Sequence, residues 1–435
     1  MLFALIGVLI LITGYVNFRK GFFLFMFYRM LLVTNITLIS VPGIPLLTLE
    51  VFLTMAFFCL YYKNKHKLYL DRVDFPYKKP FALVACTCFL STIFAYIGFN
   101  GAVSQFIAQV VCEYGFIWMM WKVIDRKDIP YLLKGFAVVF ILAGIYGFYE
   151  KITQTNPIVS YEMTLNPDTS RQVDFLFAND EYRGYRVQSF FEHAIGGGCN
   201  WGMYVAFTFA MLWVYKVKVP NGTKTLMIIA ALLSLPCIFF ANTRGAIVYF
   251  FISILSVFNL KDYRFYLRLA VIGGFILLIA PLFSDYANNV LSIFDSKAQE
   301  KVGGSNAEMR FDQLAASIEL MKMSPLVGLG YKFMNVMQTN LVAALLGLES
   351  IWFRVMTQFG LLGTAAYVYL AYFSLVKLPK RYHSQPLFFI SLAYWLTCSL
   401  TSLPAFKNYF YYFILIVLIK LSETYQNDYD QSSRK

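Results

Sequence analysis

The sequence predicts an all-α, polytopic integral membrane protein with about 12 (11–13) transmembrane helices. Two features predict this class. Hydrophobic residues make up 59% of the 435 positions and charged residues only 14%, whereas soluble domains are about a quarter charged and less than half apolar. The apolar residues also gather in runs close to the roughly 20 residues that a helix needs to cross the hydrocarbon layer. An ordinary soluble domain is therefore excluded.

The candidate spans follow one another along most of the chain. Glycine and proline interrupt several of them, which membrane helices tolerate because neighbouring helices satisfy the freed backbone groups. No basic segment precedes the first run and no small-residue cleavage motif follows it, so we expect a span there rather than a cleaved signal peptide. The runs lie at about 2–17, 21–42, 44–61, 80–98, 101–121, 132–149, 194–215, 225–241, 246–259, 265–283, 351–376, 387–403 and 406–420.

Short basic segments predict the orientation of these spans. Positively charged connections stay in the cytoplasm, so the side that carries most of the 37 Lys and Arg residues is expected to be cytoplasmic, together with the C-terminus. The net charge of +13 is then an orientation signal, and no nucleic-acid partner is expected. The basic segments are 17–20, 63–79, 122–134, 216–224, 261–268, 377–381 and the stretch from Lys420.

Two long polar loops are expected on the opposite side, and they divide the chain. Long loops in a compact fold are usually functional or disordered. The expected division is N-terminal helices 1–149, first outer loop 150–193, central helices 194–283, second outer loop 284–350, C-terminal helices 351–421 and a polar cytoplasmic tail 422–435.

The second outer loop contains a predicted amphipathic helix over residues 306–323. Ser305 and Glu308 form a capping box at its start, and Ser324-Pro325 ends it. Such a helix outside the membrane suits a position on the bilayer surface or against the bundle. The apolar residues that recur on one face at steps of three and four are Phe311, Leu314, Ile318 and Met321.

Four arginines near the expected outer face are candidate anion ligands. Arg310 lies in the first turn of the amphipathic helix, off its apolar stripe, where a solvated surface arginine is the alternative. Arg244 lies between two apolar runs, and a guanidinium there is costly unless it pairs with an anion or reaches water. Arg183 and Arg186 lead into glycines 196–198, which suits backbone approach to an anionic head group. Close helix packing explains these glycines equally well.

Two further side chains are candidates for acid–base work. His193 is the one histidine expected outside; it is either a base or a hydrogen-bonded structural group. Glu349 precedes an apolar run at the outer boundary, where burial would raise its pKa toward the working range of a base. The alternative is a carboxylate that the helix dipole favours. Arginine forks suit pyrophosphate and a carboxylate can deprotonate a hydroxyl, so the set points to chemistry on a lipid-linked phosphate.

No metal or other cofactor is expected. The seven cysteines lie within or beside apolar runs and show neither metal-ligand spacing nor a disulfide framework. We expect membrane-buried thiols.

Five segments occur in the order of the motifs of a known family. They are 149–157, 186–196, 243–246 (Thr-Arg-Gly-Ala), Arg310 followed by 324–330, and 359–363. On these motifs the chain resembles, over roughly residues 140–375, the O-antigen polymerase and O-antigen ligase superfamily of bacterial surface-polysaccharide enzymes.

The resemblance implies a metal-independent, GT-C-like membrane glycosyltransferase whose donor is an undecaprenyl-pyrophosphate-linked glycan. It implies that Arg244 and Arg310 hold the pyrophosphate and act in catalysis, with Arg183, Arg186 and His193 as further substrate-binding residues. Ligases of this family carry His-Asn eleven residues before the first glycine of the fifth motif. Here that position is Glu349-Ser350, which favours the polymerase branch and makes Glu349 the candidate base.

We therefore expect a polymerase that joins lipid-linked repeat units of an O-antigen, capsule or exopolysaccharide, with its site on the outer face of the bacterial inner membrane. A chain-length regulator and a flippase are possible protein partners. One alternative is a ligase that transfers finished glycan to lipid A or another acceptor. Another is a lipid-glycan flippase or transporter, but such proteins place charges at mid-membrane, where this chain has few candidates, such as Arg29.

Overall fold

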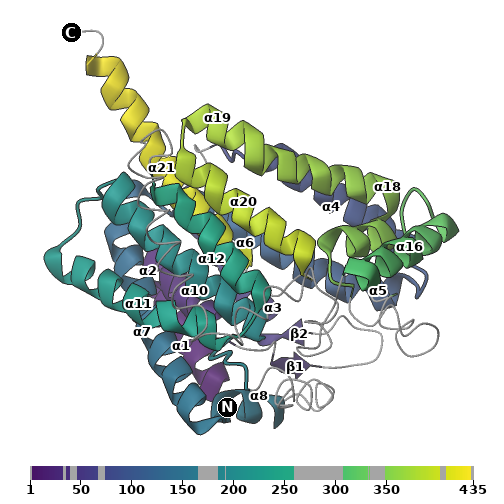
Figure 1. Cartoon of the computed structure of the whole chain (residues 1–435), viewed down its shortest axis with the longest axis horizontal. Coiled ribbons are helices and arrows are strands. Elements are labelled where there is room, and N and C mark those ends of the chain that lie inside the picture. Colours follow the sequence, from purple (N-terminus) through teal and green to yellow (C-terminus); the bar gives the residue numbers. More distant parts are fainter. Residues whose placement is uncertain are drawn as a thin grey trace, which may run out of the picture.

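The protein is almost entirely helical (Figure 1). The computed structural model describes residues 2–32, 36–39, 47–66, 74–164, 185–191, 193–258, 307–331, 333, 348–401 and 408–432. This architecture agrees with the predicted all-α membrane class. Arg183, Ser305 and the predicted span 265–283 lie outside the described residues.

Eight α-helices lie in the described part of residues 2–164. They are α1 (Leu2–Val16), α2 (Phe18–Leu31), α3 (Leu49–Asn64), α4 (Lys78–Ile93), α5 (Phe99–Phe106), α6 (Glu113–Val123), α7 (Ile129–Thr153) and α8 (Pro157–Thr164). The π-helical segment η2 (Ile107–Cys112) joins α5 to α6, and the 3₁₀ turn η3 (Arg126–Asp128) precedes α7.

The remaining helices follow the first long loop. They are α10 (Ala194–Phe209), α11 (Asn221–Phe240), α12 (Arg244–Ile254), α16 (Ala307–Met323), α18 (Ile351–Tyr372), α19 (Leu378–Tyr382), α20 (Gln385–Leu400) and α21 (Asn408–Ser432). Short segments η5 (Ala210–Val214), η6 (Leu255–Val257) and η9 (Phe373–Lys377) extend α10, α12 and α18. The structure thus confirms a helix over most of the predicted range 306–323.

The predicted run 21–42 is shorter as a helix than expected. Helix α2 ends at Leu31, and strand β1 (Thr37–Ile39) then pairs antiparallel with β2 (Leu47–Thr48) before α3. β-Branched residues fit a strand, and Pro42 and Pro45 are incompatible with a helix interior. Hydrophobicity alone does not distinguish the two structures.

Three described helical segments are long and apolar enough to cross a membrane. They are Arg126–Thr153, Asn221–Phe240 and Ile351–Tyr382. Shorter apolar helices lie at Phe3–Val16, Arg244–Val257 and Gln385–Leu400. The count of about 12 spans stays a prediction.

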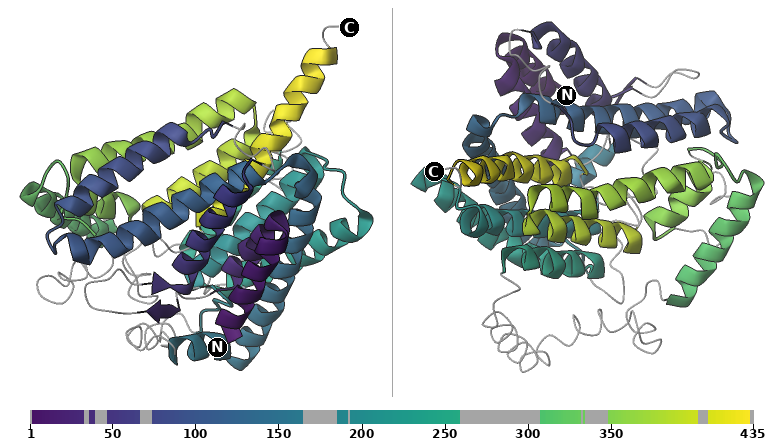
Figure 2. Two further views of the ribbon diagram at one scale, coloured as in Figure 1. Left: turned by 180° about the vertical axis from the view of Figure 1, so that it is seen from behind. Right: turned by 90° about the horizontal axis from the view of Figure 1, so that it is seen from above.

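Helix α21 forms the centre of the packed helices (Figures 1 and 2). Every residue from Tyr409 to Ile419 is buried, as expected for a helix that is apolar all round. Around it α7 packs on α11, α10 packs between α11 and α12, α12 packs on α20, and α18 packs on α4. Because the helices pack through apolar side chains, the polar groups described below lie mainly at the helix ends.

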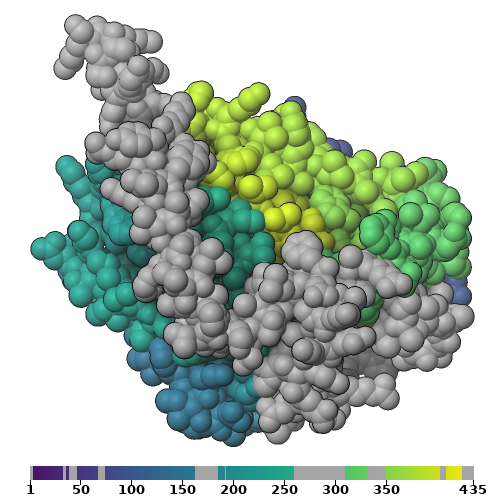
Figure 3. Space-filling view, viewed as in Figure 1, coloured from purple at the N-terminus to yellow at the C-terminus, as the bar shows by residue number. Residues whose placement is uncertain are grey.

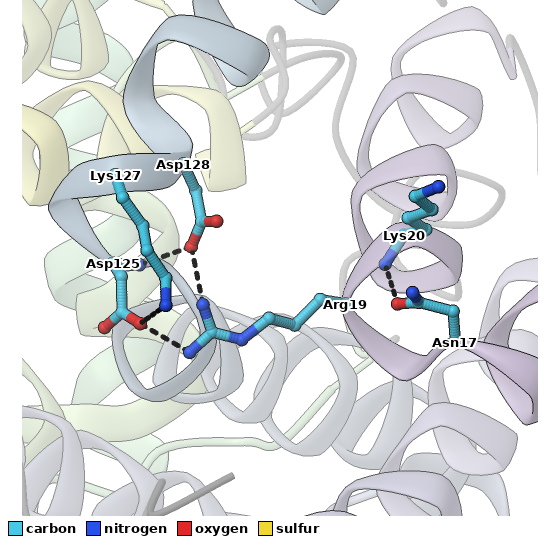
Figure 4. A network of polar contacts seen from close by, with 6 residues as sticks. All are labelled: Asn17, Arg19, Lys20, Asp125, Lys127 and Asp128. Atoms are coloured by element: carbon cyan, nitrogen blue, oxygen red, sulfur yellow. Dashed lines mark hydrogen bonds and ion pairs between the residues drawn. The ribbon is translucent and has the colours of Figure 1, made fainter.

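Several predicted cytoplasmic segments meet at one end of the helices. Arg19 at the start of α2 bonds Asp125 at 2.5 Å and Asp128 at 3.0 Å (Figure 4). The Tyr215 hydroxyl, beside the basic segment 216–224, bonds the hydroxyls of Ser384 and Ser422. The contacts agree with a shared side for these segments, and the assignment of that side to the cytoplasm stays a prediction.

Helix α18 is broken at Gly360, where φ is +61° and ψ is −157°. The loop 324–330 pairs with the break: Leu329 and Gly330 donate to the carbonyls of Thr357 and Gln358, each at 2.9 Å, and Leu361 donates to the Pro325 carbonyl at 2.8 Å. Irregular backbone at membrane depth is tolerated only when its polar groups are satisfied in this way. The glycines of the two motifs thus fix the backbone at Gln358.

Candidate functional site

Arg310 and Glu349 form the centre of the candidate site. Arg310 Nη2 lies 3.4 Å from Glu349 Oε2 and donates to the Leu400 carbonyl at 3.0 Å. The side chains are 29% and 37% exposed, so water screens the ion pair and it is weak. A guanidinium has five N–H donors, and these contacts are the ones Arg310 makes within the described ranges. Among the described residues, the remaining donors have no other recorded acceptor.

The backbone of Glu349 is anchored on helix α16. Its N–H donates to Gln313 Oε1 of α16 at 3.1 Å. The next residue, Ser350, caps α18 by accepting the N–H of Trp352. The indole N–H of Trp352 in turn donates to Ser399 Oγ at 2.7 Å. Glu349 therefore lies immediately before the N-terminus of α18.

Arg244 lies beside the same end of α20. It is the first residue of α12, and Thr243 precedes it as the cap. A Cβ on the neighbouring Gly245 would lie 3.1 Å from Thr401 Cγ2, and Thr401 follows Leu400, which accepts from Arg310. The two predicted arginines thus flank the end of α20 from different helices.

The predicted apolar stripe of α16 is exposed in part: Phe311 is 70% exposed and Ile318 is 38% exposed, while Leu314 and Met321 are half-buried. Helix α16 lies at one edge of the molecule (Figure 3). Its packed face contains the fully buried Gln313 and Ser317 together with the partly buried Ala316 and Leu320. The position of α16 on the bilayer surface or against the bundle stays a prediction.

A buried carboxylate that the sequence did not single out positions the segment with Arg186. Glu150, in the last turn of α7, accepts the N–H of Ser189 at 2.6 Å, the N–H of Gln188 at 3.2 Å and the Tyr185 hydroxyl at 3.0 Å. Asn156 donates to the Ser189 carbonyl at 2.9 Å. The sequence does contain a signal for Glu150: it is an acidic residue at the end of an apolar run, and ionisable residues at such positions usually have a functional or structural role.

His193 serves as the N-cap of α10. Its Nδ1 accepts the N–H of Ile195 at 3.1 Å. Burial and the nearby positive charge of Arg186 lower the pKa of His193 to about 4, so the ring is neutral at physiological pH and carries its proton on Nε2. This geometry favours the structural interpretation of His193 over that of a general base, and it leaves Nε2–H as a donor.

Close helix packing accounts for one of the three glycines 196–198. A Cβ on Gly198 would lie 2.4 Å from the Ala246 Cβ of α12. A Cβ on Gly197 would lie 3.1 Å from the carbonyl oxygen of Gln188, in the non-helical segment before α10.

Cysteines and acidic groups show no metal-site arrangement in the part of the chain that the structure describes. All seven cysteines are free thiols; Cys59 and Cys86 are exposed and the other five are buried. Cys59 and Cys86 lie within the apolar helices α3 and α4, and burial of the seven thiols in the membrane stays a prediction.

Comparison with known proteins matches residues 229–368 to the family model described as O-antigen ligase. No curated protein matches the chain. The matched region contains Arg244, Arg310 and Glu349, together with the glycine motifs that fix the break in α18, whereas Arg186 and His193 lie before it. Residues 229–368 are therefore similar to the O-antigen ligase family.

Proposed function

We propose that the protein is a polysaccharide polymerase that joins undecaprenyl-pyrophosphate-linked repeat units at the outer face of the plasma membrane. The observation that carries the proposal is the pairing of Arg310 with Glu349 beside the start of α12, all within the family-matched region. An anion-binding side chain and a candidate base are then in contact, as transfer from a lipid pyrophosphate requires.

In this reaction an acceptor hydroxyl attacks the anomeric carbon of the donor sugar. The bond from that carbon to the pyrophosphate oxygen breaks, and undecaprenyl pyrophosphate leaves with the bonding electrons. Arg310 and Arg244 stabilise the charge that develops on the leaving group, and the Glu349 carboxylate takes the hydroxyl proton. The pyrophosphate would compete with Glu349 for Arg310, which frees the carboxylate as the donor binds.

The position of the site supports an outer-face reaction. Arg19, Asp125 and Ser384 belong to the basic end of the helices, whereas Arg310 and Glu349 belong to the long loop and helix start that the charge distribution predicts outside. The exposed part of the α16 stripe would hold this end at the bilayer surface.

A ligase is the second candidate, and the name of the matched family favours it. Against it stands Glu349-Ser350 at the position where the resemblance implies His-Asn in ligases. A carboxylate can replace an imidazole as a base, so the choice depends on the product.

Gel analysis of surface glycan and lipid-linked intermediates from a strain lacking the gene tests the proposal. The polymerase predicts collapse of a glycan ladder to single repeat units, with the ladder restored by the gene. A full ladder left on the lipid carrier would instead identify a ligase. Repeat units accumulating on the cytoplasmic face would identify a flippase and overturn both enzymatic candidates.

A further inference from the structure

A cavity of about 210 Å³ with both polar and apolar walls lies among the helices, separate from Arg244 and Arg310. It is bounded by the end of α5, by η2, by the starts of α3, α6 and α21, by α20, and by α18 from Ile351 to Leu370. Arg354 and Gln358 of α18 line it, and Arg354 lies one turn after Ser350. The cavity therefore shares the beginning of α18 with Glu349, the candidate base.

One buried polar group on the cavity wall has no hydrogen-bond partner among the described residues. It is the indole N–H of Trp395, a residue that is 5% exposed. The side-chain amide of Gln358, a residue that is 9% exposed, belongs to the lining of the same cavity. Native proteins satisfy nearly all such groups, and each exception calls for a partner such as water or a ligand.

The charges around the cavity nearly balance. Glu50 and Glu113 line it, and both carboxylates are ion-paired to the fully buried Arg29. Arg354 adds one positive charge from the α18 side. Two carboxylates against two guanidiniums give no net attraction for a phosphate, so the ligand that fits is neutral.

Amides, aromatic rings and aliphatic side chains make up the rest of the lining. Gln105, Gln109 and Asn408 add amide donors and acceptors, while Tyr394 and Trp395 add aromatic rings. Amides both donate to and accept from hydroxyl groups, carboxylates accept from them, and aromatic faces pack against C–H surfaces. A hydroxyl-rich ring with one apolar face satisfies this set, whereas an acyl or prenyl chain would leave the polar groups unsatisfied.

We propose that this cavity binds a sugar residue of the substrate glycan, with Gln358 and Trp395 as hydroxyl-binding residues. The inference rests on the proposed function. The sugar would lie along α18, one to two turns from Glu349, while the pyrophosphate lies at Arg310 and Arg244. The cavity between the helices would then determine which sugar binds. Arg310 and Arg244, at the helix ends, would stabilise the charge of the leaving group.

Two nearly shape-preserving substitutions test the proposal. Gln358→Leu removes the amide, and Trp395→Phe removes the indole N–H while keeping an aromatic ring against Tyr394. The protein, in lipid nanodiscs, is titrated with two probes: the lipid-linked repeat unit extracted from a strain lacking the gene, and sugar-free undecaprenyl pyrophosphate. Tyr249→Phe is the control, because it also removes a buried group that lacks a partner among the described residues but does not line the cavity.

Each cavity variant should bind the lipid-linked repeat unit about five- to tenfold more weakly, as loss of one hydrogen bond predicts. Binding of the sugar-free lipid should not change, and the thermal unfolding midpoint of Gln358→Leu should stay equal or rise. Tyr249→Phe should bind both probes like the wild type. Unchanged binding of the repeat unit, as expected if only water fills the cavity, would overturn the proposal, and so would equal weakening for both lipids.

The same titration separates this proposal from the proposed function. If the wild type fails to bind undecaprenyl pyrophosphate, or if Arg310→Ala binds it equally well, the pyrophosphate role fails. The comparison of Gln358→Leu with the wild type on the repeat unit still decides the sugar site.

Discussion

Two arginines of this protein pair with carboxylates in opposite ways. Arg29 is 1% exposed, bonds Glu50 and Glu113 from two other helices, and lies 4.6 Å from the Phe116 ring and 4.8 Å from the Tyr409 ring. Arg310 is 29% exposed and meets a single carboxylate at 3.4 Å. The first guanidinium is enclosed by protein, and the second is open to a ligand.

The difference indicates that Arg29 has a structural role and that Arg310 is the candidate for substrate binding. Arg29 joins α2, α3 and α6 through its bonds to Glu50 and Glu113. Arg310 gains little from Glu349, since an exposed ion pair contributes about 0–1 kcal/mol. Because Arg29 is explained by its structural role, its position within the helices does not indicate a transporter.

The largest expected effect is on stability, from Arg29→Ala. Removing one partner of a buried ion pair costs about 3–5 kcal/mol, and here two carboxylates would remain. The yield of folded protein and the unfolding midpoint in detergent measure the loss. Arg310→Ala is the matched control and should cost no more than about 1 kcal/mol; equal destabilisation by both variants would contradict the distinction.

The next effect is on catalysis, from Glu349→Gln. Loss of a general base lowers turnover by about 10²–10⁴-fold, while the amide keeps the size of the side chain and donor binding should change little. Measuring kcat and KM separately for the purified protein distinguishes an effect on turnover from an effect on donor binding. Full turnover with glutamine would remove Glu349 from the mechanism.

Gly360→Ala should destabilise the protein by roughly 1–3 kcal/mol. The backbone at φ +61° and ψ −157° belongs to a region that essentially only glycine occupies, and the new Cβ would lie 2.7 Å from Gly328 N. Thermal unfolding measures the loss. Gly222→Ala in α11 meets nothing within 4 Å and should be neutral or slightly stabilising.

The smallest effect concerns pH. The pKa of His193 is about 4 in the folded protein and 6.5 ordinarily, so below pH 6.5 the unfolded chain binds a proton that the folded one does not. Stability should therefore fall by about 1–2 kcal/mol between pH 6.5 and pH 5. His193→Asn keeps an N-cap side chain and should flatten this part of the pH–stability curve; an unchanged slope would exclude His193 as its source.

The sequence predicts the helical class and the outer polar residues because apolar runs and charges at their ends are local signals. Arg310 and Glu349 stand out for that reason, and the structure brings them together. Gln358, Trp395 and Glu150 do not stand out, because their roles depend on neighbours distant in the chain: a broken helix, a cavity wall and the 185–189 segment. The strand pair β1–β2 was missed because its residues are as apolar as those of a span.

The most direct test of the central claim is surface-glycan synthesis by Arg310→Ala and Arg244→Ala in a strain lacking the chromosomal gene. Membrane-inserted protein is quantified in the same cells. The pyrophosphate role predicts wild-type amounts of inserted protein, single repeat units in place of a ladder, and no rescue at Arg244 by lysine, which lacks the bidentate fork. A normal ladder from either alanine variant would contradict it.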